Sequence, residues 1–469
     1  MSAPRPDVPV LTFLGGAGTV TGSRFLLDTP DARVLVDAGL FRGLKPLRMR
    51  NWEAFPVDPA AIDAVVVSHA HVDRAGYLPV LVRNGFAGRV HVTNGTADLA
   101  AIVLPDAGHL QEEEAAYANR KGFSKHQPAL PLFTEDDARS TLRLLQVHAF
   151  GEETEIAPGV HLTLRPAGHI LGSATVTLRL AGPPERRIVF SGDLGRPQHP
   201  ILQPPAPIGR ADVVVLESTY GGRHHDDAGA LDRFRDAIVR TAARGGSVLI
   251  PAFAVDRTEV VLLQLRRLLD AGAIPDLPVY VDSPMALAAL ATYRRAIARG
   301  EPEIDPGLGA AGDPFDNGRL VEVRTVEQSK GLARVHGPAI IVSASGMATG
   351  GRVVHHLARL LPDHRNTVLL VGYQAAGTRG RQLAEGARAV KMLGRYVPVR
   401  ADVVDLGAFS VHADHDELLA WLATADGPLD AVYLVHGEPD SSEALREAID
   451  RLDRGPAVVA RPGERVRLD

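Results

Sequence analysis

Residues 65–76 read Val65-Val66-Val67-Ser68-His69-Ala70-His71-Val72-Asp73-Arg74-Ala75-Gly76, an apolar run that stops at two histidines and an aspartate. A β-branched run of this length predicts a buried strand, and the loop that leaves such a strand is where α/β sheets carry their chemistry. The His-x-His-x-Asp pattern supplies nitrogen and oxygen ligands and is close to that of a dinuclear zinc site. Arg74 departs from that pattern, because a guanidinium cannot deprotonate to become a ligand.

The composition narrows the choice of metal ligands. The 469 residues include no cysteine, which excludes disulfides and Cys-bound zinc and leaves His, Asp and Glu as the ligands.

The charge balance gives little sign of a nucleic-acid partner. Lys and Arg number 51 against 56 Asp and Glu, a net charge of −5. No global basic field therefore indicates a nucleic-acid partner, although an enzyme can keep its positive groups inside one cleft.

No segment of the sequence indicates a membrane or a secretory route. The N-terminus has no apolar core of the signal-peptide type, and no later stretch approaches the roughly 20 uninterrupted apolar residues of a membrane span. Together with the absence of cysteine, this favours a cytoplasmic protein without a membrane partner.

The first part of the chain reads as short apolar strands separated by Gly and Asp turns. Many strands and few early helices favour a sandwich of sheets, with an exposed helical excursion at residues 106–125. The strands are expected at residues 11–14, 24–27, 34–37, 64–68, 89–92, 160–164, 174–180 and 187–191.

A proline-rich link at residues 197–207 leads to a part with a different pattern. With 45% hydrophobic residues the chain can bury a core in each of two lobes. Short buried strands now alternate with helices, which predicts a parallel, doubly wound α/β lobe. The strands are expected at residues 213–216, 247–250, 279–282, 339–343 and 367–371, and the helices at 231–243, 257–270 and 351–361. From about Val403 the pattern changes again.

Other polar residues follow strands in the same way as His69 and His71. His169 and Asp193 each come after a predicted strand and stand beside glycines, which let the backbone approach closely. His412 and His436 follow strand-like segments later in the chain.

The order of these residues resembles the metallo-β-lactamase superfamily, whose fold is an αβ/βα sandwich. Three further motifs resemble its β-CASP branch of RNA-processing nucleases: Glu217-Ser218-Thr219-Tyr220-Gly221, Ser343-Ala344-Ser345-Gly346-Met347-Ala348-Thr349-Gly350-Gly351-Arg352 and Phe409-Ser410-Val411-His412-Ala413-Asp414. The resemblance covers nearly the whole chain. It implies a metallo-β-lactamase domain over residues 1–209 and 397–469, with a β-CASP domain inserted at 210–396.

The resemblance also implies two zinc ions bridged by one aspartate. Asp37 matches a family aspartate that supports the site from a neighbouring loop, although a turn aspartate before Gly39 explains it equally well. The first zinc would be held by His69, His71, His169 and Asp193, and the second by Asp73, Asp193 and His436 together with a histidine at the position of Arg74.

Arg74 leaves three interpretations open. The second metal could bind with water in place of the missing ligand. The guanidinium could instead occupy the place of the second cation and pair with Asp73 or Asp193, leaving one metal or none. Arg74 could also swing outward and contact a substrate phosphate. A weakened or empty second site is favoured, because a permanent positive charge opposes a nearby divalent cation.

The family pattern assigns the chemistry to three further side chains. Zinc lowers the pKa of bound water to about 7 and polarises a phosphoryl oxygen. Asp73 would orient or deprotonate that water, His412 would protonate the leaving oxygen, and Glu217 would hold the His412 imidazole in the required tautomer. Taken alone, His412 would be interpreted as a structural histidine.

The Gly-rich turn after residues 339–343 suggests a phosphate cradle, because backbone amides and a helix N-terminus would face an anion. Tight helix-to-sheet packing is the alternative explanation. The turn at Asp282-Ser283-Pro284-Met285 matches one that the family places near the scissile phosphate. The predicted substrate-binding residues are Ser283, Ser345, Gly346, Thr349, Gly350 and Arg352, whereas His224, His225, His355 and His356 are expected on the surface or on a helix face and not among the ligands.

These observations predict a metal-dependent hydrolase that cleaves single-stranded RNA, with zinc as its cofactor. A catalytically impaired RNA-binding relative and a small-molecule hydrolase are the alternatives. The residues 210–396 weigh against the last, because a small substrate would not need phosphate-type loops. The late apolar strands could serve a homodimer interface.

Overall fold

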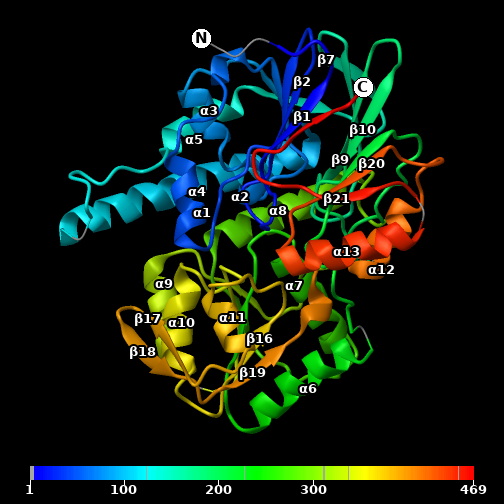
Figure 1. Cartoon of the computed structure of the whole chain (residues 1–469). Helices are drawn as coiled ribbons and strands as arrows, with labels where there is room; N and C mark the ends of the chain where they lie inside the picture. The colour runs from blue at the N-terminus through cyan, green and yellow to red at the C-terminus, as the bar shows by residue number, and fades with distance from the viewer. Residues whose placement is uncertain (1–4, 123, 227, 310–311, 336, 453) are drawn as a thin grey trace. The chain divides into compact units, whose positions relative to one another are not determined.

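The computed structural model describes residues 5–122, 124–226, 228–309, 312–335, 337–452 and 454–469. These residues form two compact units. The first comprises the chain up to His224 and again from His412, and the second comprises His225–Val411. Figure 1 shows the course of the chain through both units.

The first unit contains two sheets of seven strands. The first sheet holds β1 (Val10–Gly15), β2 (Arg24–Asp28), β3 (Arg33–Val36), β4 (Ala64–Val66), β5 (Arg89–Thr93), β6 (Leu145–His148) and β22 (Arg465–Arg467), in the order β22-β1-β2-β3-β4-β5-β6. The second sheet holds β7 (Glu153–Ala157), β8 (Val160–Pro166), β9 (Ala174–Leu180), β10 (Arg186–Phe190), β11 (Val213–Glu217), β20 (Ala431–Val435) and β21 (Ala457–Val459), in the order β21-β20-β11-β10-β9-β8-β7.

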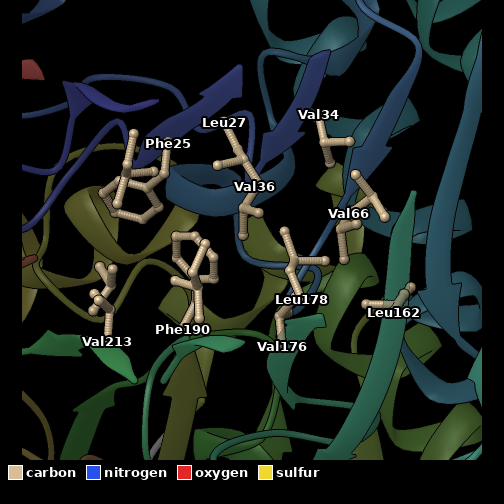
Figure 2. Packing of buried hydrophobic residues seen from close by; sticks show 14 of the residues in the cluster. Phe25, Leu27, Val34, Val36, Val66, Leu162, Val176, Leu178, Phe190 and Val213 are labelled. Atoms are coloured by element: carbon tan, nitrogen blue, oxygen red, sulfur yellow. The ribbon is translucent and has the colours of Figure 1, made fainter. Parts of the chain in front are cut away.

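The core of this unit lies between the two sheets. Figure 2 shows side chains of β2, β3 and β4 pointing toward side chains of β8, β9 and β10. Phe25 of the first sheet stacks on Phe190 of the second, with ring centroids 5.9 Å apart. Alternate residues of each strand enter this layer because successive side chains of a strand point to opposite faces. The predicted sandwich of sheets is therefore confirmed.

Helices cover the outer faces of the sandwich. Helix α4 contacts β5 and β6 on the first sheet, while Leu418 of α12 and Leu445 of α13 share a buried cluster with Val214 and Val432 on the second. The helices of this unit are α1 (Lys45–Met49), α2 (Val72–Ala75), α3 (Leu78–Arg83), α4 (Asn94–Lys121), α5 (Glu135–Leu142), α12 (His415–Leu422) and α13 (Pro439–Leu452), with short 3-10 turns η1 (Arg50–Trp52) and η2 (Pro59–Ala61).

The second unit is built on a six-stranded sheet in which each strand is parallel to its neighbours. This confirms the predicted parallel α/β lobe. The strands are β12 (Val248–Pro251), β13 (Val279–Val281), β14 (Leu320–Glu322), β15 (Ile340–Ser343), β16 (Thr367–Leu370) and β19 (Asp402–Asp405), in the order β14-β13-β15-β12-β16-β19. The helices are α6 (Ala230–Ala243), α7 (Arg257–Asp270), α8 (Pro284–Arg299), α9 (Val326–Gly331), α10 (Arg352–Leu360) and α11 (Arg379–Ala384), with a hairpin of β17 (Ala389–Met392) and β18 (Arg395–Pro398).

Two strands lie in a different sheet from the one that the sequence pattern suggested. β11 was expected to open the second lobe, but it pairs in parallel with β10 and β20 of the first unit. β19 was expected after the return to the first domain, but it pairs with β16 of the second unit. The two compact units divide at 224 and 411, whereas the domain bounds predicted from the sequence are 209 and 396. β11 is buried along its whole length, and a short strand buried on both faces carries no local signal for the sheet that it joins.

The predicted excursion at 106–125 is the second half of a longer helix. α4 begins at Asn94, where the side chain of Thr93 caps it by accepting a hydrogen bond from the N–H of Thr96. It ends at Lys121 and is followed by Gly122, whose φ is 65°. Its first half packs inside the unit and therefore reads as an apolar segment rather than as an amphipathic helix. Position 123 lies outside the described residues. Among the described helices, none has the length and hydropathy of a membrane span.

A buried pair of histidines in the first sheet predicts a pH dependence of stability. His91 Nδ1 lies 2.8 Å from His148 Nε2. Burial, together with the charges of His148 and Arg89, lowers the pKa of His91 to about 4. An unfolded histidine titrates near pH 6.5, so between about pH 6.5 and pH 4 the unfolded chain binds a proton that the folded chain does not. The free energy of unfolding should therefore fall by up to about 3 kcal/mol across this window as the pH is lowered.

Urea unfolding of the wild type and of His91→Gln, between about pH 7.5 and pH 5, checks this result. The variant should lose less stability on acidification, since it lacks the titrating group, and the difference between the two proteins removes the contribution of the carboxylates. The same pH dependence in both proteins would contradict the assignment to His91.

Candidate metal centre

Four of the predicted ligands meet in the first unit. His69 and His71 lie on the turn between β4 and α2, His169 follows β8, and Asp193 follows β10. One ligand atom from each of the four lies within 4.8 Å of the others. Strands of both sheets thus deliver ligands to the same place.

The spacing of these atoms fits one tetrahedral metal ion. His71 Nδ1 lies 3.1 Å from His69 Nε2 and 3.3 Å from His169 Nε2. Asp193 Oδ2 lies 3.5 Å from His69 Nε2 and 3.8 Å from His169 Nε2. Ligands bound at the usual zinc distances of about 2.1 Å would be about 3.4 Å apart along the edges of a tetrahedron. The types and spacing of these four side chains therefore fit a zinc site.

The histidines are held in the form that binds a metal. Burial is the main cause that lowers the pKa of His69 and of His169 well below the usual value, so both imidazoles are neutral. Ser68 Oγ lies 3.2 Å from His69 Nδ1. This contact leaves Nε2 of that ring facing the cluster, an orientation that a neighbouring hydrogen bond commonly imposes on a ligand histidine.

The guanidinium of Arg74 lies on the other side of Asp193. It donates to Asp193 Oδ1 and, over 2.9 Å, to Asp37 Oδ2. Arg74 is 1% exposed, so the interpretation in which it swings outward is wrong. Burial would lower its pKa, but the charges of Asp193, Asp37 and Asp73 outweigh burial and raise the pKa. One carboxylate oxygen of Asp193 thus faces the histidine cluster, and the other accepts from the permanent cation of Arg74.

Asp37 supports the site from its own loop, as the family pattern implied. Its backbone has a φ of 60°, which is uncommon for a residue other than glycine. One carboxylate oxygen accepts from the N–H of Ser68 over 2.8 Å, and the other accepts from the Ser68 hydroxyl and from Arg74. Asp37 therefore fixes both the ligand turn and the guanidinium.

Asp73 and His436 lie beside this ion pair. His436 Nε2 is 3.7 Å from Asp73 Oδ2 and 3.6 Å from Asp193 Oδ1. His436 Nδ1 lies 2.7 Å from the hydroxyl of Ser23. Burial and the charge of Asp193 raise the pKa of Asp73 to about 6, against the opposing charges of Arg74 and Arg42. Sequence reasoning missed Ser23, because a serine 413 positions from its partner leaves no local pattern.

His412 and Glu217 are also brought together. His412 Nδ1 lies 3.4 Å from Glu217 Oε1, and the His412 ring lies over that of His169 with centroids 4.4 Å apart. Glu217 is fully buried and accepts from the N–H of Leu194 over 2.7 Å. The side chain of His412 is 16% exposed, so part of its ring is open to solvent while Nδ1 faces Glu217.

The predicted substrate-binding residues lie in the second unit. Ser283 caps α8 by accepting from the N–H of Ala286 over 3.2 Å. The hydroxyls of Ser345 and Thr349 lie 3.1 Å apart across the Gly-rich turn, and Thr349 and Gly350 are exposed. Gly346 is buried, where a side chain would strike Phe253. The turn therefore leaves its later residues open to a ligand and its earlier residues packed.

Arg352 is half-buried and binds groups of the protein. It donates to Asp282 Oδ1 over 2.7 Å and to the carbonyl oxygens of Val323 and Arg324. His356 lies on a face of helix α10 that is buried rather than at the surface, and its Nε2 lies 2.6 Å from Asp282 Oδ2. Arg352 and His356 are four residues apart on α10, so both reach the same carboxylate.

Comparison with known proteins agrees with this architecture. The Beta-lactamase superfamily domain matches residues 32–244, the Beta-Casp domain matches 258–383, and the Zn-dependent metallo-hydrolase RNA specificity domain matches 396–459. A protein of Enterococcus faecalis V583 whose solved structure is described as of unknown function has the same fold, with a TM-score of 0.53 and 15% identity over 98% of this chain and 100% of that one.

Two relatives match along most of their length. The chain is 38% identical to Ribonuclease TTHA0252 of Thermus thermophilus, over 96% of this chain and 98% of that protein. It is 33% identical to transcription termination factor FttA of Pyrococcus abyssi, over 94% of this chain and 68% of that protein. The chain therefore belongs to the β-CASP family of metallo-β-lactamase-fold hydrolases.

Proposed function

We propose that this chain is a ribonuclease that cleaves phosphodiester bonds of single-stranded RNA and uses one zinc ion where its family pattern has two. The match to an RNA specificity domain and the likeness to a protein named as a ribonuclease support RNA as the substrate. The pairing of Arg74 with Asp193 carries the single-metal part of the proposal.

Electrostatics favour one metal. Asp73, Asp193 and His436 are the remaining ligands for a second ion, and the guanidinium of Arg74 already binds the Asp193 oxygen on that side. A second divalent cation would have to share this carboxylate with a buried positive charge at contact distance. That repulsion is strong in a site from which water is excluded.

The residues of the chain divide the chemistry between them. When bound, zinc supplies a nucleophilic water near neutral pH and polarises the phosphoryl oxygen. His412 is the partly exposed group beside the cluster, so it donates the proton to the leaving oxygen. Glu217 orients its imidazole, and Arg74 keeps Asp193 ionised.

Metal analysis of the purified protein and of Arg74→His, paired with cleavage of a labelled single-stranded RNA, tests the proposal. We expect about one zinc per chain in the wild type and about two in Arg74→His, because the substitution removes the cation and adds a neutral imidazole. Cleavage should be lost with a chelator and return with added zinc.

Two outcomes would contradict it. About two zinc ions in both proteins would show that Arg74 does not exclude the second metal. The wild type could bind RNA but hold no zinc and cleave nothing, while Arg74→His gains both zinc and cleavage. This result would favour the non-catalytic RNA-binding alternative, which the buried ion pair of Arg74 also favours. A homodimer and a cytoplasmic location stay predictions.

A further inference from the structure

Residues 42–52 form a basic segment in the first unit, here called the 42–52 segment, which includes α1 and η1 (Figure 1). It carries Arg42, Lys45, Arg48 and Arg50 and no acidic residue. Arg42, Lys45 and Arg48 are exposed. In a chain with a net charge of −5, this is a local concentration of positive charge.

The same segment exposes large apolar side chains. Leu44 is 51% exposed, Met49 50% and Trp52 56%. The chain has two tryptophans, and the other, Trp421, is buried and donates its Nε1 hydrogen to the carbonyl oxygen of Ala206. An exposed indole among cations is the composition of surfaces that stack bases and contact phosphates.

The segment is held on a fixed frame. Asn51 is buried, and its side-chain oxygen accepts from the N–H of Phe41 over 2.9 Å while its amide donates to the Phe41 carbonyl over 2.8 Å. Arg24 donates to the same Asn51 oxygen and lies 3.7 Å from the centre of the Tyr77 ring. Both ends of the segment are therefore anchored, and its exposed groups lie on a prebuilt surface.

The loop before the 42–52 segment is hydrogen-bonded to the turn and helix next to the metal ligands. The N–H of Ala38 donates to the carbonyl of Arg74 over 2.7 Å, and the N–H of Leu40 donates to that of Val72 over 2.9 Å. A Cβ at Gly39 would come within 1.6 Å of the Asp73 carbonyl oxygen, so the loop that contains Gly39 is in contact with helix α2. Five residues of chain reach at most about 18 Å, so the segment begins within that distance of Asp37.

We infer that the 42–52 segment binds the single-stranded RNA that enters the metal centre, with Trp52 stacked on a base and with Arg42, Lys45 and Arg48 on phosphates. The inference rests on the proposed function, because the metal centre is what brings a phosphodiester strand to this place. Such contacts tolerate any base, since every base has a π-face and every nucleotide a phosphate.

An anionic membrane is the other surface that attracts cations mixed with Leu, Met and Trp. Helix α1 has five residues, which is too short for an amphipathic helix lying in a lipid interface. The hydrogen bonds of Ala38 and Leu40 to helix α2 place the segment beside the metal centre, a position that membrane attachment does not require. RNA is therefore the partner that the segment fits.

The test measures binding of a short oligoadenylate to the full chain, with a chelator present so that no cleavage occurs. Tryptophan fluorescence should fall as RNA is added, because the exposed indole of Trp52 stacks on a base, and this change should vanish in Trp52→Phe. The dissociation constant is also measured for Trp52→Ala and for the triple variant Arg42→Glu, Lys45→Glu, Arg48→Glu.

A matched control changes the same number of charges elsewhere. Arg120, Lys121 and Lys125 are exposed residues at the far end of α4 and beyond it. The triple variant Arg120→Glu, Lys121→Glu, Lys125→Glu alters the net charge by the same amount without touching the 42–52 segment. Melting temperatures of all variants verify that they fold.

Trp52→Ala should weaken binding about 5- to 150-fold. The triple variant in the 42–52 segment should weaken it further and reduce the slope of log affinity against log salt by about 2, the value for three lost phosphate contacts on a single strand. The control triple variant should change neither quantity to this extent.

Unchanged affinity in Trp52→Ala and in the segment triple variant would overturn the inference. Equal losses in the segment and control triple variants would overturn it too, because they would reflect net charge alone. So would binding to phosphatidylserine vesicles that depends on Trp52 while RNA binding does not. If the wild type cleaves RNA in any of these cases, the proposed function stands and only the inference fails.

Discussion

Replacing Arg74 with alanine should lower the free energy of unfolding of the zinc-free protein by about 3 to 5 kcal/mol. The substitution leaves Asp37 and Asp193 as uncompensated charges, both 1% exposed. Loss of one partner of a buried ion pair costs more than the pair contributes, since the remaining charge has neither water nor a counter-ion. Urea unfolding measures the change, and Arg319→Ala is the control, because Arg319 and Asp276 form an exposed pair whose loss should be negligible.

A double-mutant cycle identifies the source of this loss. In an Asp37→Asn background, one of the two charges that Arg74 neutralises is already absent, so Arg74→Ala should cost clearly less than in the wild type. Equal costs in both backgrounds would show that the loss comes from packing. Added zinc should recover part of the stability of Arg74→Ala, because a divalent cation can then take the place of the guanidinium beside Asp193.

Replacing His412 with alanine should lower the rate of RNA cleavage about 10²- to 10⁴-fold, the usual contribution of a general acid. RNA affinity and zinc content should stay unchanged, because His412 is not among the four clustered ligands. Glu217→Gln should cause a smaller loss and shift the pH profile, since it alters the hydrogen bond that orients the imidazole. Single-turnover cleavage of labelled RNA measures these effects.

His224 provides the control for this experiment. Its side chain is 62% exposed and its partner is Asp416 at the surface, so His224→Ala should cleave RNA as the wild type does. A His412→Ala protein that cleaves at the wild-type rate would remove His412 from the chemistry. Loss of zinc together with loss of activity would instead make it a part of the metal centre.

The architecture could be predicted from sequence where local patterns report burial. The alternation of apolar residues in β8 and β9 follows the two faces of a sandwich, and the run of strands and helices in the second unit follows a parallel sheet. The assignment of β11 could not be predicted, because both of its faces are buried in the first unit and its residues look the same in either sheet. The sheet that a strand joins depends on contacts with residues far away in the sequence.

The same limit applies to the candidate site. Ligand-type residues after strands drew attention to His69 and His169, and the structure brings them together, although their binding of zinc stays a prediction. Sequence reasoning paired Arg74 with Asp73 or Asp193, whereas the structure pairs it with Asp193 and Asp37. The second partner depends on the left-handed backbone of Asp37, which places its carboxylate under the turn at Ser68. No spacing rule reports such a conformation.

The chain leaves the first unit and returns to it at nearly one point. The N–H of His415 donates to the carbonyl of Arg223 over 3.0 Å, and the rings of His224 and His415 lie 5.1 Å apart. The residues 225–411 are therefore an insertion whose flanking residues meet within the first unit, and the clustered metal ligands all lie outside them. A domain inserted in this way can be replaced by another without disturbing the strands around the insertion site. Evolution could thus change what the enzyme recognises while inheriting its metal chemistry intact.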